Sequence, residues 1–185
     1  MKGTMRGCVA GAPTCWLVAG AVTCGLLLAA GPGAAAKETA GQRAPAAPCA
    51  SKQLIADSAQ RIGGSKVRIT VINDGPKACA LKGFPTVALA GQGSPDRNKP
   101  LNVVRQGRAR AVPLAVGGRA WTQLTFTPVL GEAEGFCASG VEPTVAPSIV
   151  LGVGGGGLQV APDDGGEFAL CGDTVRATAF RGGGS

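Results

Sequence analysis

The sequence predicts an all-β protein, a β-sandwich of about 7–9 antiparallel strands held by two disulfides. Three observations predict this class. The 185 residues include 31 glycines and 13 prolines, which divide the chain into short apolar runs. No window keeps apolar residues three and four positions apart over three helical turns. Four of the seven cysteines lie beyond residue 36, an even number that suits disulfide bonds.

The first 36 residues have the order of parts found in a secretory signal. Lys2 and Arg6 precede an uncharged stretch at 7–36, whose most apolar part is 16–30. Small residues follow and end at Ala36. A basic start, a short apolar core and a small-residue end are typical of a signal peptide, so we expect cleavage after Ala36 and export to the cell envelope or the medium.

Two alternatives for this segment are weaker. A membrane anchor needs about 20 apolar residues, and the core at 16–30 falls short of that length. A lipid-bearing cysteine normally closes the apolar core, whereas Cys24 has three leucines after it, at 26–28. Lipid anchoring at Cys24 is therefore not favoured.

The rest of the chain divides into three parts. Residues 37–48 are polar and rich in alanine and proline, which predicts a flexible linker. The sandwich is expected over 49–181, and residues 182–185 are expected to form a flexible tail.

Strands are expected where polar and apolar residues alternate between turn residues. The first hairpin turns at Gly63-Gly64 and leads into 66–71, which alternates strictly. The next strand, 84–90, is opened by Pro85. Further strands are expected, in chain order, at 101–105, 109–116, 120–127, 148–153, 158–161, 168–171 and 174–180.

Residues 152–157 match the G-x-G-x-x-G pattern of dinucleotide-binding sites. Such a site requires a helix directly after the glycines. Here the segment 158–161 reads as a strand and ends at Pro162. We therefore interpret the glycine run as a hairpin turn.

The positions of the cysteines predict their pairing. Cys49 and Cys79 are nearly symmetric about the Gly63-Gly64 turn, and Cys137 and Cys171 are symmetric about Gly154. Residues placed in this way face each other across a hairpin, so we predict the disulfides 49–79 and 137–171. A thiolate metal site is not expected, because the sequence has no C-x-x-C pair among these four.

One stretch of the sequence is similar to a known family. An Asn-x-Gly turn at Asn73 leads into Cys-x-Leu-x-Gly-Phe-Pro, residues 79–85. With the two later cysteines, this pattern resembles the actinobacterial secreted family called domain of unknown function 4232, over about 49–180. The resemblance implies an exported immunoglobulin-like sandwich, and it implies no activity. The turn residues themselves are those that Asx-type turns use.

The sequence contains no histidine, which removes the commonest general base and zinc ligand. We therefore expect a protein that is not an enzyme and has no cofactor. The acidic residues Asp163, Asp164 and Glu167 read as a solvated turn rather than a calcium site. A carboxylate-dependent extracellular hydrolase stays as an alternative if these residues or Glu142 converge in one cleft.

Charge is unevenly distributed along the chain. Residues 97–119 contain six basic side chains and no acidic one, whereas 120–175 contain seven acidic side chains and no basic one. Arg105, Arg108 and Arg110 are candidate contacts for an anionic partner, although a solvated face is the simpler interpretation.

The partner of such a segment would be an anionic envelope polymer, a lipid surface or an envelope protein. Nucleic acid is not expected, because no aromatic residues are interleaved with these arginines. Trp121 is expected to pack against a disulfide in the core. The function predicted is that of an exported, non-enzymatic binding module, with a structural envelope lipoprotein as the other alternative.

Overall fold

The computed structural model describes residues 46–91, 98–131 and 135–183. They belong to one unit, Gln42–Ser185. The expected signal peptide, with Cys24 and its cleavage point, lies outside the described residues, as does most of the expected linker. No helix within the described residues is long and apolar enough to cross a membrane.

The described residues form fourteen strands and one 3-10 turn. In chain order these are η1 (Ser51–Gln53), β1 (Leu54–Gly63), β2 (Lys66–Asn73), β3 (Cys79–Leu81), β4 (Thr86–Ala90), β5 (Asn98–Pro100), β6 (Asn102–Gln106), β7 (Val112–Leu114), β8 (Arg119–Phe126), β9 (Thr144–Ala146), β10 (Ser148–Val153), β11 (Gly156–Val160), β12 (Phe168–Leu170), β13 (Thr174–Thr178) and β14 (Arg181–Gly182).

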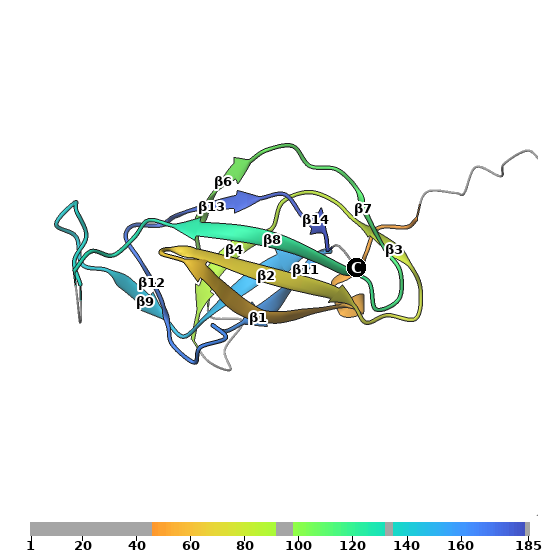
Figure 1. Ribbon diagram of the computed structural model, residues 1–185, viewed down its shortest axis with the longest axis horizontal. Coiled ribbons are helices and arrows are strands. Elements are labelled where there is room, and N and C mark those ends of the chain that lie inside the picture. The colour runs from red at the N-terminus through yellow and green to blue at the C-terminus, as the bar shows by residue number, and fades with distance from the viewer. Residues whose placement is uncertain (1–45, 92–97, 132–134, 184–185) are drawn as a thin grey trace, which may run out of the picture. The chain divides into compact units, whose positions relative to one another are not determined.

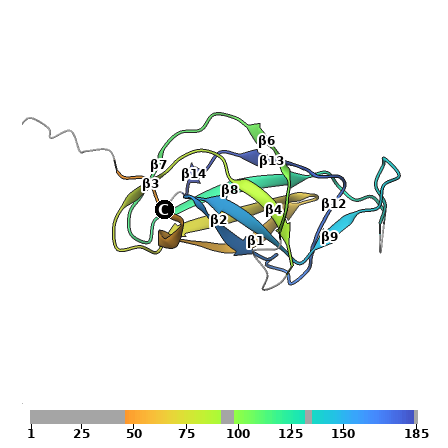
Figure 2. The same cartoon turned by 180° about the vertical axis from the view of Figure 1, so that it is seen from behind.

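Two sheets make the layers of the fold. The six-stranded sheet has the order β1-β2-β8-β13-β6, with β14 also pairing with β8, and the four-stranded sheet has the order β11-β10-β4-β5. Figure 1 shows the first sheet in front of the second, and Figure 2 shows the reverse. The short pairs β12-β9 and β3-β7 extend the two ends.

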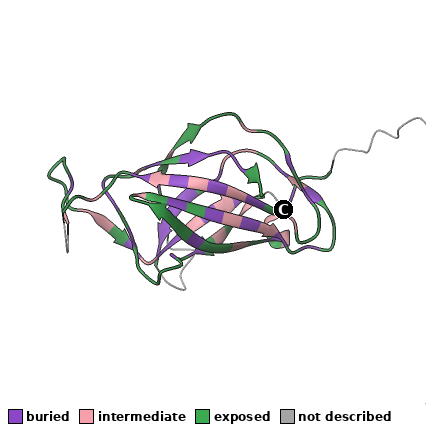
Figure 3. Cartoon of the chain, viewed as in Figure 1, coloured by how far each residue is buried: buried purple, intermediate pink, exposed green. Residues whose placement is uncertain are grey.

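The core lies between these layers and follows from strand periodicity, since alternate side chains point to opposite faces. On β2 the inward residues are Val67, Ile69 and Val71, none more than 2% exposed. Ile149 and Leu151 of β10 meet them from the opposite sheet and are fully buried. The alternating colours along β2 and β8 in Figure 3 show the same periodicity.

The two sheets are connected at both edges. At one edge the Ala59 amide donates to the Ala161 carbonyl at 2.8 Å, where a bulge interrupts β1. At the other edge the chain passes from β5 into β6, and between them the Leu101 amide continues the β4–β5 ladder by donating to the Val87 carbonyl at 2.9 Å. The bond between Ala59 and Ala161 protects edges that would otherwise be open to pairing with other chains.

The all-β class and both disulfides are confirmed. Cys49 is bonded to Cys79 and Cys137 to Cys171, with Cα–Cα distances of 4.9 and 5.6 Å. The first bond joins the chain before η1 to β3. The second joins the segment after β8 to the end of β12.

Several details differ from the sequence prediction. The expected strand 109–116 is only Val112–Leu114, and β4 begins at Thr86 rather than at Phe84. Strands β3, β5, β9 and β14, of two or three residues each, were not expected. The pair β6–β13 is parallel, whereas the sequence predicted antiparallel strands throughout.

The Asn-x-Gly turn has the predicted Asx geometry. The Gly75 amide donates to Oδ1 of Asn73 at 3.2 Å. Asn73 is fully buried at the end of β2, and Nδ2 donates to the carbonyls of Lys77, Leu114 and Ala115. This one side chain therefore connects two turns of the fold.

Candidate functional site

The burial pattern of strand β8 shows which side chains lie on the outer face of the six-stranded sheet. Its inward side chains, including Ala120, Thr122 and Leu124, are fully buried. The remaining positions must point outward, and among them are Arg119 and Trp121. The same alternation on β2 turns its polar positions to this face.

Register brings basic residues from four strands together on this face. Lys66 of β2 and Arg176 of β13 both lie opposite Thr125 of β8. Arg68 lies opposite Gln123, the next outward residue of β8. Each outward residue of β8, with the residues paired to it, is called a level below. Arg181 of β14 lies opposite Trp121, and Arg119 of β8 occupies the last level. We call this set the cationic face: Lys66, Arg68, Arg119, Trp121, Arg176 and Arg181.

Trp121 lies between two arginines rather than against a disulfide. The guanidinium carbon of Arg68 is 4.9 Å from the indole centroid, and that of Arg181 is 5.3 Å away. The expectation that Trp121 packs in the core is therefore wrong. Its neighbours Ala120 and Thr122 occupy the core positions, so the indole points outward and attracts cations through its π system.

In the described part of the chain, no carboxylate forms an ion pair with the cationic face. Among the residues that the structure describes, one ion pair is present, and it joins Arg61 to Asp164. Within the six strands of this sheet, the sequence places one acidic residue, Asp57, on the edge strand β1. The five cations are exposed, so their charge faces solvent without local compensation.

The predicted basic segment lies elsewhere. Arg105 is on β6, and its guanidinium carbon lies 5.7 Å from the ring centroid of Phe84. Phe84 is only half-buried, so it contributes to this contact as well as to the core edge. Arg108 and Arg110 are exposed between β6 and β7. Their role as contacts for an anionic partner stays a prediction.

The acidic candidates form a structured loop. Asp164 accepts hydrogen bonds from Nε of Arg61 and from the Gly166 amide, the latter at 3.0 Å. Asp163, Glu167 and Glu142 are exposed, and no cluster of three potential metal ligands occurs in the described part of the chain.

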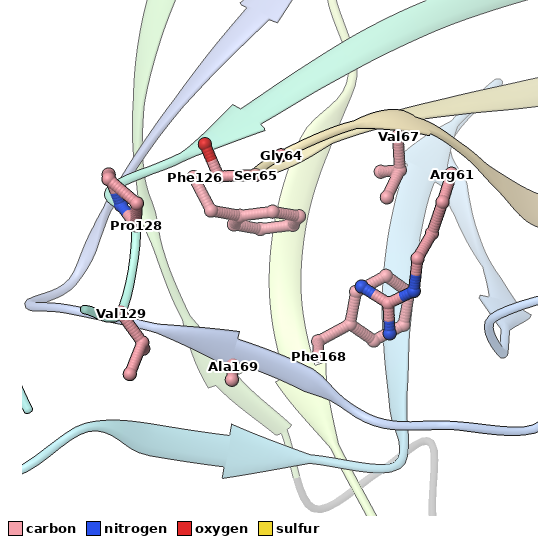
Figure 4. Close-up of a pocket in the computed structure, with 9 residues that line it drawn as sticks. All are labelled: Arg61, Gly64, Ser65, Val67, Phe126, Pro128, Val129, Phe168 and Ala169. Atoms are coloured by element: carbon pink, nitrogen blue, oxygen red, sulfur yellow. The ribbon is translucent and has the colours of Figure 1, made fainter. Parts of the chain in front are cut away.

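A cavity of about 310 Å³ opens beside this loop, at the end of the sandwich (Figure 4). The rings of Phe126 and Phe168 lie 5.8 Å apart in its wall. Arg61 lies at its edge, but that guanidinium is held by Asp164 and by the Glu167 carbonyl at 2.7 Å. The described residues that line the cavity include no carboxylate.

We expect the Arg61–Asp164 pair to contribute to how the free energy of unfolding falls in acid. The Gly166 amide, and then Arg61, lower the pKa of Asp164 below its ordinary value of 3.8. A group whose pKa is lower in the folded state stabilises the fold above its unfolded pKa, and the contribution is lost as the pH falls through the folded pKa.

Arg61→Gln should therefore raise the pKa of Asp164 toward its ordinary value, while the Gly166 hydrogen bond keeps part of the shift. A carboxyl NMR titration measures this directly, with Arg108→Gln as the control that should change nothing. An unchanged pKa in Arg61→Gln would show that the ion pair does not act on Asp164.

The glycine run at 152–157 is a hairpin turn, as predicted. It connects β10 to β11, and Gly154 and Gly155 both have positive φ. A side chain on Gly154 would come within 2.7 Å of the Cys49 carbonyl oxygen. The glycines are thus required for a turn and for a close approach to the disulfide-bonded segment, and no helix follows them.

The sequence indicates parts of the cationic face, but on strands that are far apart in the chain. Arg68 lies two positions after Lys66, and Trp121 two positions after Arg119, as residues on one face of a strand must. What sequence reasoning missed was that β2 and β8 are neighbours in the sheet.

Residues 49–181 match the family described as Domain of unknown function (DUF4232). No curated protein matches the chain. No solved structure matches it either.

Proposed function

Since the chain belongs to the DUF4232 family, whose description assigns no activity, we propose that it is an exported, non-enzymatic module that binds an anionic partner in the cell envelope through the cationic face. The observation that supports this most directly is that five exposed cations share one face of the sheet, two of them against Trp121, and that no ion pair joins any of them to a carboxylate in the described residues.

Export is supported by two independent features. The N-terminal sequence has the parts of a secretory signal. The two disulfides favour an oxidising compartment, because thiols in the cytosol are kept reduced.

The absence of histidine from the sequence supports a role in binding rather than catalysis. The acidic residues that a hydrolase would need are engaged elsewhere or scattered: Asp164 holds Arg61, and Asp173 accepts a hydrogen bond from Asn102 at 2.8 Å. Long-range attraction between the cationic face and a polyanion would raise the association rate and depend on salt.

The test is binding of the purified full chain to cell-wall fragments, with and without acid extraction of their anionic polymers. Lys66→Glu/Arg176→Glu reverses two charges at one level of the cationic face and leaves the contacts of Trp121 intact. We expect retention to fall about 10-fold or more, and to fall for the unmodified chain on extracted fragments.

Lys52→Glu/Lys99→Glu is the matched control, because it makes the same change in net charge at exposed residues outside both the cationic face and the arginines at 105–110. Its retention should stay within about 2-fold of the unmodified chain. Equal losses in the two double variants would refute binding at the cationic face. So would full retention of the Lys66→Glu/Arg176→Glu protein.

A further inference from the structure

We propose that the ligand of the cationic face is a linear polyanion of the phosphodiester-linked polyol or sugar class, lying along β8. This inference rests on the proposed function and adds the chemical class of the partner. It follows from how the cations are spaced on the sheet.

Successive levels of β8 each have a cation. Lys66 and Arg176 flank Thr125, Arg68 lies beside Gln123, Arg181 lies beside Trp121, and Arg119 occupies the end. Two residues advance about 6.7 Å along a strand, so these levels repeat at that distance over roughly 20 Å. A polymer with one charge at about this interval would meet a cation at each repeat.

The width of the face also suits a single extended chain. The cations lie on β2, on β8, and on β13 and β14, which both pair with β8. This row of cations, called the track below, is therefore two strand spacings wide, about 9.5 Å. A small anion is held best where several donors converge on one point. Here the charges follow a line on an open sheet, which favours an extended ligand.

Trp121 arranges the middle of the track. Its contacts with Arg68 and Arg181, at 4.9 and 5.3 Å, hold two long side chains that would otherwise move freely. Fixing them before binding reduces the conformational entropy lost when a ligand is bound. The indole is therefore a positioning residue and also a fluorescent reporter of ligand contact.

Single-stranded nucleic acid fits this face less well. Proteins that bind it stack successive bases on several aromatic side chains. The strands β2, β8, β13 and β14 contain two aromatic residues, Trp121 and Phe126, and Phe126 is buried in the core. One half-buried indole, with an arginine on each neighbouring strand, leaves no row of stacking positions, which favours a polymer without bases.

The experiment is a titration of the full chain, followed by Trp121 fluorescence, with glycerol phosphate and its phosphodiester-linked oligomers of two, four and eight repeats. Trp121→Phe identifies the signal, since Trp16 is the other tryptophan. Affinity should rise about 100-fold or more between one and four repeats and then level off. Log K should fall with log salt with a slope of roughly −3.5 for five contacts.

Removing one cation should make the dependence of the affinity on salt less steep. Arg119→Gln should reduce the salt slope by about 0.7, because one phosphate contact is lost. Trp121→Ala lacks the fluorescent reporter, so its affinity is measured by calorimetry, and it should bind about 5-fold more weakly. Lys99→Gln, on β5 of the other sheet, is the control and should leave both the affinity and the slope unchanged. Loss of the slope difference between Arg119→Gln and Lys99→Gln would overturn the placement along β8.

Each other outcome overturns the proposal in a distinct way. Equal affinity for one and four repeats would indicate a small-anion site. Tighter binding of an oligothymidylate with the same number of charges would indicate nucleic acid. Binding only to phosphatidylglycerol vesicles would indicate a lipid surface. If the oligomers fail while wall binding still depends on Lys66 and Arg176, the ligand class is wrong and the proposed function stands.

Discussion

Replacing Asn73 with alanine should lower the free energy of unfolding by about 2–4 kcal/mol, one of the two largest effects that we expect from a local change. The side chain is fully buried, and its amide group donates to three backbone carbonyls from two turns. Alanine removes these donors and leaves carbonyl oxygens inside the protein without their partner.

The position of Asn73 explains the size of this effect. Its backbone also pairs with the β7–β8 turn, since the Asn73 amide donates to the Gly118 carbonyl at 2.9 Å and the Gly117 amide donates to the Asn73 carbonyl at 2.8 Å. The residue thus joins the turn after β2 to the turn before β8. Loss of the side chain loosens both turns together.

Asn73→Asp separates the two roles of this side chain. The carboxylate can still accept the Gly75 amide and keep the Asx turn, but it cannot donate to Lys77, Leu114 or Ala115. A buried charge facing three carbonyl oxygens should destabilise more than alanine does. Urea unfolding measures all of these differences.

The control is Asn102→Ala, which removes an exposed hydrogen bond to Asp173 and should cost less than about 1 kcal/mol. A loss below 1 kcal/mol in Asn73→Ala would mean that the turns hold their geometry without the amide. A loss in Asn73→Asp smaller than in Asn73→Ala would mean that the acceptor role dominates.

Local features of the sequence predicted the parts of the fold that depend on local chemistry. The Asn-x-Gly turn needs only Asn73 and Gly75 in their order, and the glycine hairpin needs only the run after β10. Both disulfides followed from the symmetry of cysteines about turns. The alternation of 66–71 predicted β2 for the same reason, because side-chain direction is fixed by position along a strand.

Long-range pairing could not be predicted in this way. The parallel pair β6–β13 joins segments far apart in the chain, and no local pattern states which strand will lie beside which. The cationic face depends on such pairing, since Arg68 and Arg181 meet only across β8. The closely spaced arginines at 105, 108 and 110 therefore stood out in the sequence, while the residues of the cationic face, which are far apart in the chain, did not.

Trp121 is an intermediate case. Residues 120–127 have two faces, and one of them carries Ala120, Leu124 and Phe126, which is the more apolar set apart from the indole. A comparison of the apolar residues on the two faces would have predicted that Trp121 points outward. Its size and hydrophobicity suggested the core instead, because a tryptophan beside a disulfide is common in sandwiches.

Removing the Cys49–Cys79 disulfide should cost about 3–4 kcal/mol, an effect similar in size to that of Asn73→Ala. The bond closes a loop of 30 residues, which limits the conformations of the unfolded chain. Both cysteines are at most 5% exposed, so the double variant Cys49→Ala/Cys79→Ala keeps apolar groups in the core, whereas serine would bury two hydroxyls.

The native fold retains some links at this position. The Cys49 amide donates to the Ala80 carbonyl at 3.0 Å, and the Ser51 amide donates to the Gly154 carbonyl at 2.9 Å. These bonds should keep the N-terminal segment in place after the sulfurs are removed, so the loss should appear in the unfolding free energy rather than in the folded structure. Amide NMR spectra of the double variant should stay close to those of the unmodified chain.

The second disulfide provides the comparison that tests this explanation. Cys137–Cys171 closes 34 residues, so loop entropy predicts a cost for Cys137→Ala/Cys171→Ala within about 1 kcal/mol of the first pair. Urea unfolding of both double variants measures the two costs. A much smaller cost at Cys137–Cys171 would show that the segment after β8 opens on its own before the core does, because a local opening that the disulfide restrains contributes little to global stability.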